Sequence, residues 1–193
     1  MKHIEEKTSI RFERYDSSKH NNWVILADYK DGVASSYVGR MKDSGWQRVN
    51  LDTDWAIGGH DLGSAIYELV HALGWQHTQA RPDRDTYVTI NKGNIEDGKG
   101  GNFNIAQSSV YDAVQKCRAY DYGSIMHYSG DAFSKNGKNT ISTKDSSKQD
   151  NIGQRSGLSK QDATEIQEYY FGFPKCIPRE KTCITIFGTK VCF

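Results

Sequence analysis

Two histidines and a glutamate stand close together near the middle of the chain. His71 and His77 are six residues apart, Glu68 precedes His71 by three, and Gly74 lies between the two histidines. Imidazole nitrogens bind divalent metals, and a carboxylate beside the ion can accept a proton from a water molecule. The spacing indicates a candidate metal site with a general base next to it.

A helix is the element that would position these groups. Between Asp61 and Leu73, apolar residues recur at steps of three and four, which predicts an amphipathic helix with Asp61 as its N-cap. Positions 67 and 71 then lie one turn apart on the same face. Gly74 can end the helix in a left-handed conformation, so that His77 approaches the ion from another direction.

Tyr67 is the unexpected residue in this segment. Catalytic zinc sites of this kind follow the pattern H-E-x-x-H-x-x-G-x-x-H, and Tyr67 stands where the first His belongs. A phenol ionises near pH 10 and is a poor zinc ligand unless the metal lowers that pKa. The free energy of zinc binding at a structural site is about 10–16 kcal/mol, so the loss of one His removes on the order of 3–5 kcal/mol of it.

Five segments together resemble the astacin family of zinc metalloendopeptidases, which belong to the metzincins. The matches run in order from about Ile4 to Cys176 and include a segment similar to the family's Met-turn, 121–128. The other matching segments are 5–12, 36–40, 71–77 and 81–90.

The resemblance implies an α+β fold of the zincin type. The upper part would hold a small mixed twisted sheet and the zinc helix. The lower, mostly irregular part would hold the Met-turn and a C-terminal helix, with peptide substrate between the two parts. We expect this domain to cover residues 1–175, with the family's N-terminal strand missing.

The resemblance also implies roles for individual residues. One Zn²⁺ would be bound by His71 and His77, with Tyr67 at the position of the first ligand. Glu68 would be the general base, and Tyr128 would stabilise the oxyanion. Gly74 and Met126 would be structural, with Met126 forming the floor under the metal.

Three hypotheses remain open for Tyr67. It abolishes zinc binding, it supports a weaker site through its own oxygen or a water, or another histidine such as His60 replaces the lost ligand. The first function hypothesis is therefore a zinc endopeptidase that uses a zinc-bound water and is impaired by Tyr67. The alternative is an inactive pseudoprotease that binds peptides or proteins.

Other departures from the family concern folding and maturation. Ser9, Ala34 and Gly59 stand where the family's disulfide bridges have cysteines, and Thr78 stands where many astacins have Glu. The pairing of the four cysteines present is open; they are Cys117, Cys176, Cys183 and Cys192.

The remaining elements follow from local patterns. We expect strands at Ser9–Phe12, Asn22–Ala27, Ser36–Arg40 and Gln47–Leu51, the last as an edge strand that aligns substrate. A helix should begin near Leu158 with a capping box of Ser159 and Asp162 and end at Gly172. Residues 78–157 should be mostly irregular, and the tail 176–193 should form a hairpin around Gly188 and Thr189.

Charge and hydropathy limit the kinds of partner that we expect. The net charge of +1 gives no case for nucleic acid or an anionic membrane, and no run approaches the roughly 18 apolar residues of a membrane span. The start of the chain lacks the apolar stretch of a secretion signal, so an extracellular location is implied by the resemblance alone. Peptides or proteins are the expected partners, and the oligomeric state is open.

Overall fold

The computed structural model describes residues 1–29, 33–41, 44–51, 62–106 and 118–172, together with two strands near the C-terminus. Its helices and strands are α1 (Lys2–Lys7), β1 (Trp23–Ala27), β2 (Ser35–Ser36), β3 (Trp46–Asn50), α3 (Leu62–Ala72), β4 (Val88–Ile90), β5 (Ile141–Thr143), α5 (Lys160–Phe171), β6 (Cys183–Ile186) and β7 (Thr189–Cys192). The predictions that fall on His60, Asp61, Cys117 and Cys176 lie outside the described residues.

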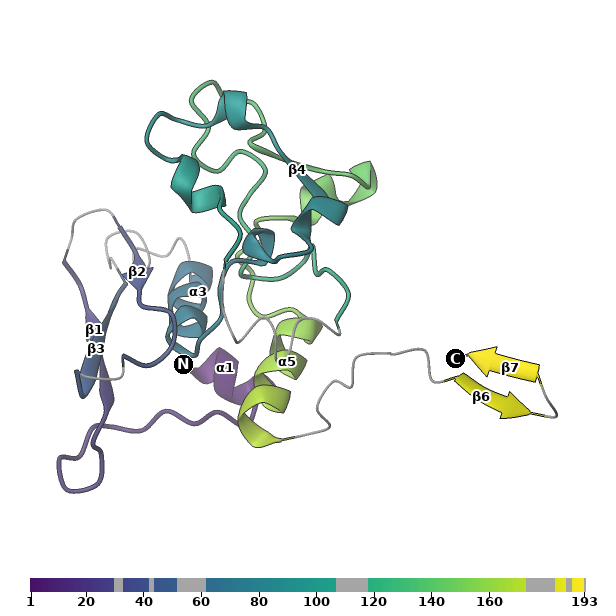
Figure 1. The fold of residues 1–193 in the computed structure, drawn as a ribbon. Helices are drawn as coiled ribbons and strands as arrows, with labels where there is room; N and C mark the ends of the chain where they lie inside the picture. Colours follow the sequence, from purple (N-terminus) through teal and green to yellow (C-terminus); the bar gives the residue numbers. More distant parts are fainter. Residues whose placement is uncertain are drawn as a thin grey trace.

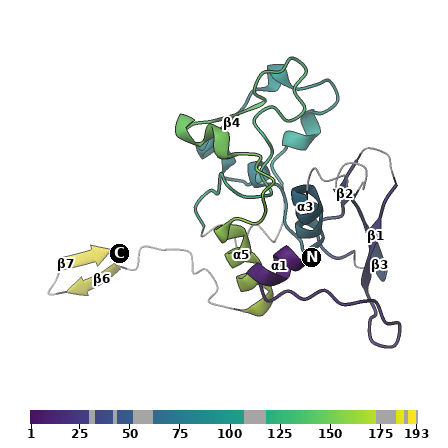
Figure 2. The ribbon, with the colours of Figure 1, turned by 180° about the vertical axis from the view of Figure 1, so that it is seen from behind.

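One part of the fold consists of a small sheet beside α3, with α1 and α5 next to each other (Figures 1 and 2). Strand β3 is central: it pairs in parallel with β1 and antiparallel with β2. The mixed sheet is therefore confirmed. The expectation that Gln47–Leu51 is an edge strand is wrong, because β3 has a partner on each side and β2 is an edge instead.

The other part is mostly irregular, as expected. It contains the two-stranded antiparallel sheet of β4 and β5 and short 3₁₀ helices at Thr78–Ala80, Arg84–Thr86, Lys92–Asn94, Gly100–Phe103 and Ser146–Asn151. A buried cluster stabilises it, formed by Val88, Ile95, Phe103, Tyr120, Ile141 and Ile152.

A second core joins the elements around α3. Its buried members come from α1, α3, α5 and the segments between them: Ile4, Ile66, Tyr67, Leu69, Val70, Trp75, Ile125, Met126, Leu158 and Ile166. The side chain of Lys7 also donates a hydrogen bond to the carbonyl oxygen of Leu158. This core gives the candidate site a rigid base.

The expected helix after Leu158 is present, with its cap. Asp162 donates its backbone N–H to Ser159 Oγ at 2.9 Å, and the Asp162 side chain accepts from the Ser159 backbone at 2.9 Å. Gly172 ends the helix with φ of 71° in the left-handed region.

The segment Ser9–Phe12 was wrongly predicted as a strand. Its backbone N–H groups donate to side chains: Ser9 to Gln167 Oε1, Ile10 to Thr8 Oγ1 and Phe12 to Glu5 Oε1. Because these donors already have acceptors, the segment needs no strand partner.

The hairpin near the C-terminus is present as β6 and β7. Its register pairs Ile186 with Thr189, so Thr189 belongs to a strand and not, as expected, to the connection between the two strands.

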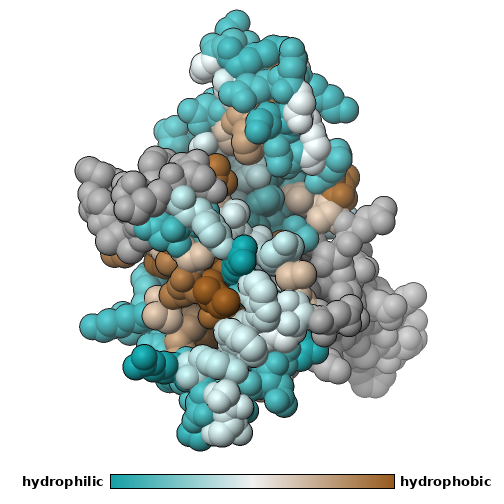
Figure 3. Space-filling view, turned by 90° about the vertical axis from the view of Figure 1, so that its left-hand side faces the viewer, coloured by the Kyte–Doolittle hydropathy of each residue, from teal (hydrophilic) through white to brown (hydrophobic). Residues whose placement is uncertain are grey.

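Strand β1 carries unusually exposed apolar side chains. Val24, Ile25 and Leu26 are 40–44% exposed, and a hydrophobic patch is visible on the face where this sheet lies (Figure 3). No helix within the described residues has the length and apolar character needed to cross a bilayer.

Candidate active site

Helix α3 presents Tyr67, Glu68 and His71 on its buried side. Their exposed fractions are 8%, 5% and 5%. Positions 67 and 71 are one helical turn apart and share a face, as predicted, and the two rings meet edge to face at 4.8 Å between centroids. The helix therefore holds the first part of the predicted site.

The end of α3 turns the chain toward His77. Gly74 has φ of 109°, in the region that favours glycine, and its N–H donates to the carbonyl oxygen of His71 at 2.8 Å. Trp75 donates its N–H to the carbonyl oxygen of Val70 at 3.2 Å. This turn performs the role predicted for Gly74, because His77 reaches His71 six residues later.

The two histidines converge. Their Nε2 atoms are 3.0 Å apart, and His71 Nδ1 lies 2.7 Å from the carbonyl oxygen of Trp75. A carbonyl only accepts, so Nδ1 carries the proton and the Nε2 of neutral His71 has a lone pair, as in metal-binding histidines. Burial lowers the pKa of His71 to about 4 and that of His77 to about 3, the latter with help from His71. Both rings are neutral at pH 7, as metal ligands must be.

Glu68 lies in the same cleft as the two histidines. Burial raises the pKa of its carboxyl to about 7, and the positive charge of Arg155 opposes that rise. Its Oε2 is buried and has no hydrogen-bond partner among the described residues. A carboxyl with this pKa and an unoccupied acceptor suits proton transfer near neutral pH.

Tyr67 contacts both histidines. Besides its contact with His71, its ring stacks on that of His77 at 5.8 Å with an interplanar angle of 21°. The guanidinium of Arg155 lies 4.6 Å from the Tyr67 ring centroid. The residue at the first-ligand position is therefore an aromatic ring packed between two imidazoles and a cation.

The turn 121–128 lies directly beneath the site. Thr78 donates its N–H to the carbonyl oxygen of Met126 at 3.1 Å, and Tyr128 donates its N–H to Gln79 Oε1 at 3.0 Å. Met126 is buried in one cluster with Tyr67. The Tyr128 ring lies 4.5 Å from that of His77, so both residues predicted from this turn are at the site.

His127 is turned away from the histidine pair. It is fully buried, its Nε2 is 2.8 Å from the Tyr120 hydroxyl, and its Nδ1 is 2.7 Å from the carbonyl oxygen of Tyr128. Both ring nitrogens of His127 therefore have partners outside the histidine pair.

Sequence reasoning missed Arg155, and it placed the strand Ser36–Arg40 too late in the chain, since β2 is Ser35–Ser36. Arg155 lines the cleft, and its guanidinium donates to the carbonyl oxygens of Ile125 and His127 at 3.1 and 3.2 Å. Residues 33–36, which include β2, also line this cleft, whose volume is about 630 Å³. A lone arginine in a loop and a two-residue strand carry no periodic signal that could have revealed them.

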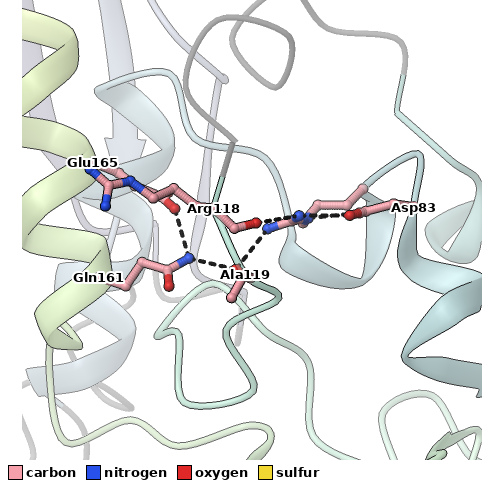
Figure 4. A network of polar contacts seen from close by, with 6 residues as sticks. Asp83, Arg118, Ala119, Gln161 and Glu165 are labelled. Atoms are coloured by element: carbon pink, nitrogen blue, oxygen red, sulfur yellow. Dashed lines mark hydrogen bonds and ion pairs between the residues drawn. The ribbon is translucent and has the colours of Figure 1, made fainter. Parts of the chain in front are cut away.

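The loop after His77 is fixed to α5 by a polar network (Figure 4). Arg81 donates to the carbonyl oxygens of Arg118 and Ala119 and forms an ion pair with Asp83, while Gln161 donates to Ala119 and to Glu165. Asp83 thus helps to fix the position of the Arg81 side chain.

The described residues fit a zinc ion only in part. His71 and His77 converge and their rings are neutral at pH 7, but within the ranges that the structure covers no third His, Cys, Asp or Glu completes a metal-binding group. At the position of the first ligand, the ring of Tyr67 contacts both imidazoles.

Comparison with known proteins identifies the family of this chain. The family model for Astacin, a peptidase family, matches residues 1–171. The chain belongs to the astacin family. It is 43% identical over 165 residues to zinc metalloproteinase nas-13 of Caenorhabditis elegans and 36% identical over 167 residues to blastula protease 10 of Paracentrotus lividus. These matches cover 86% and 84% of this chain but only 34% and 26% of the two relatives.

A solved zinc-protease structure has the same fold. The hatching enzyme zinc-protease HCE-1 of Oryzias latipes superposes with a TM-score of 0.73 at 35% identity, covering 88% of this chain and 78% of that one. The α+β fold expected from the sequence, with its small sheets and few helices, is therefore confirmed.

Proposed function

We propose that this astacin-family chain is a zinc-dependent metalloendopeptidase in which Tyr67 weakens metal binding. The observation that carries the proposal is the 3.0 Å approach of the His71 and His77 Nε2 atoms beside the buried Glu68 carboxyl. Family membership supports a peptide substrate and an extracellular location.

Each residue has a distinct part in the proposed reaction. Zinc, when bound by His71 and His77, would acidify water and polarise the scissile carbonyl. Glu68 accepts the proton of the attacking water and later passes it to the leaving amine. Its pKa of about 7 allows both steps near neutral pH.

Tyr128 stabilises the oxygen that becomes negative. Burial, together with the Glu68 carboxylate, raises the pKa of the Tyr128 phenol to about 12, so its O–H stays protonated and can donate a hydrogen bond. A single such donor contributes on the order of 10²–10³-fold to the rate.

Strand β2 aligns the substrate backbone. It pairs with β3 on one side only within the described residues, and it lines the cleft that contains Glu68 and His71. An extended peptide can add to this edge by main-chain hydrogen bonds. This assigns to β2 the role that we expected for Gln47–Leu51.

A second function is favoured by Tyr67 itself. Its ring packs on both histidines beneath Arg155, an arrangement that stabilises the cleft without a metal. In this case the protein is a pseudoprotease that binds peptides along β2 without cleaving them.

Zinc content and cleavage distinguish the two functions. We expect the purified protein, equilibrated with zinc, to contain about one ion by elemental analysis and to cleave a mixed peptide library. Glu68→Gln, the matched control, should keep the zinc and lose cleavage. Tyr67→His should raise zinc affinity about 100-fold or more. A metal-free, inert wild type whose Tyr67→His variant binds zinc and cleaves would establish the pseudoprotease.

A further inference from the structure

The hairpin of β6 and β7 places two of the four cysteines directly opposite each other. Cys183 begins β6, Cys192 ends β7, and the antiparallel register pairs the two. Directly opposite residues in such a ladder have Cα atoms about 4.5 or about 5.5 Å apart, depending on the hydrogen-bond pattern. A disulfide needs Cα atoms about 4.4–6.8 Å apart, so either spacing allows a bridge without movement of the backbone.

The alternation of the strands puts both cysteines on one face of the hairpin. Residues two apart in a strand share a face, and so do directly opposite residues. Cys183, Cys192 and Lys190 therefore lie on one face, whereas Val191 lies on the other. The lysine adds a positive charge to the face of the cysteines. Such a charge favours the thiolate, which is the form that attacks a disulfide.

A cross-link at this end of the hairpin would contribute to its stability. Within the residues that the structure describes, β6 and β7 pair only with each other. A two-stranded hairpin is at best marginally stable in water by itself. The chain joins the two strands only where β6 leads into β7, so a covalent bond at the opposite end stabilises the hairpin by restricting the unfolded chain.

We propose that Cys183 and Cys192 form a disulfide bond across the hairpin. The thiolate of one cysteine attacks a disulfide such as oxidised glutathione and releases one glutathione thiol, and the second cysteine then displaces the other glutathione. The two cysteine thiols are thereby oxidised to one disulfide, and one oxidised glutathione is reduced to two thiols.

The bond limits the possible pairings of the other two cysteines. Four cysteines allow three fully paired connectivities. The bond across the hairpin selects the one in which Cys117 can pair only with Cys176, both of which lie outside the described residues. The inference does not depend on the proposed function, since neither β6 nor β7 lines the cleft.

Peptide mapping tests the bond directly. The full chain is equilibrated with oxidised and reduced glutathione, its free thiols are alkylated, and it is digested with trypsin without reduction. Because trypsin cleaves after lysine and arginine, each cysteine falls on its own peptide: 117–118, 176–179, 182–190 and 191–193. We expect mass spectrometry to find 182–190 joined to 191–193 by a bond that reduction breaks, in a chain that runs as a monomer on a non-reducing gel.

A double variant keeps the composition and changes only the face. Val191→Cys combined with Cys192→Val moves the second thiol by one residue, to the opposite face of β7. The equilibrium constant for joining the two peptides, measured against glutathione, should fall on the order of 100-fold or more, because a disulfide between opposite faces is strained. Cys117→Ser combined with Cys176→Ser, the control, should leave that constant unchanged.

Four results would overturn this proposal. The first is a bond from 182–190 or 191–193 to either of the other two cysteine peptides. The second is alkylation of both Cys183 and Cys192 in the equilibrated wild type. The third is a bond that occurs only in a covalent dimer. The fourth is an equilibrium constant that is the same in the wild type and in the double variant at 191 and 192.

Discussion

The guanidinium of Arg155 lies 4.6 Å from the ring centroid of Tyr67, and together they close one side of the cleft. A cation–π contact of this kind contributes about 0.5–2 kcal/mol, depending on desolvation. Arg155 also donates to the carbonyl oxygens of Ile125 and His127. It therefore links α3, the turn that carries Met126, and the loop before α5.

Replacing Arg155 should destabilise the whole site. We expect Arg155→Gln to lower the free energy of unfolding by about 2–3 kcal/mol, because carbonyl oxygens lose a charged donor and the ring loses its cation. Urea unfolding measures the change. Tyr67→Phe is the matched control, since it keeps an aromatic ring under the guanidinium. It should lower the free energy of unfolding by less than half as much as Arg155→Gln. Equal losses for the two variants would contradict this account.

The buried carboxyl of Glu165 should make stability depend on pH. It is 3% exposed, accepts hydrogen bonds from Trp75 and Gln161, and burial raises its pKa from 4.5 to about 7. Between these two values the folded protein keeps a proton that the unfolded chain has lost. The contribution of Glu165 to the free energy of unfolding is therefore present at low pH. It decreases by about 3 kcal/mol as the pH rises to about 7.

Glu165→Gln isolates this effect from the histidines, whose lowered pKa values act in the opposite direction. The difference in unfolding free energy between variant and wild type should shift in favour of the variant from pH 5 to pH 8. Glu6→Gln, at an exposed position on α1, is the control and should give a flat difference. A flat difference for Glu165→Gln as well would show that its carboxyl titrates normally in the folded protein.

The helices could be predicted from the sequence because their signals are local. In α3 the apolar residues recur with helical period, and in α5 the pair Ser159 and Asp162 forms the expected cap. The convergence of His71 and His77 also follows from local geometry, since one helical turn and one glycine determine it. These features need little knowledge of the rest of the chain.

The features that sequence reasoning missed depend on distant residues. Whether β3 is an edge strand depends on β1 and β2, which come from separate segments. Arg155 reaches the cleft only because the segment before α5 packs against α3. Ser9 fails to join a strand because Gln167, 158 residues away, accepts its N–H. No local pattern encodes such contacts.

The Ser9–Gln167 pair should stabilise the contact between the first segment and α5. Gln167 accepts from the Ser9 backbone at 2.7 Å and donates to Ser9 Oγ at 2.9 Å, at the position where the family has a bridging cysteine. Gln167→Ala removes both hydrogen bonds and should lower the free energy of unfolding by about 1 kcal/mol. Ser9→Ala removes one of them and should lower it by about half as much. In a double-mutant cycle the two losses should not add; strict additivity would mean that the pair has no energetic coupling.

Gly63 determines how closely α3 approaches the segment that carries Arg155. A Cβ atom on Gly63 would lie 1.8 Å from the carbonyl oxygen of Arg155 and 2.5 Å from its carbonyl carbon, and backbone atoms cannot move aside cheaply. Gly63→Ala should therefore lower the free energy of unfolding by about 1–3 kcal/mol or more through overpacking, although alanine favours a helix by up to about 1 kcal/mol.

A matched variant separates the clash from the general effect of replacing glycine. At Gly93 a Cβ meets no atom within 4 Å, so Gly93→Ala should leave stability within about 0.5 kcal/mol of wild type. Guanidinium unfolding of both variants gives the comparison. If Gly63→Ala is as stable as wild type, α3 and the Arg155 backbone are farther apart than described. The contact between the Arg155 guanidinium and the Tyr67 ring would then be wrong as well.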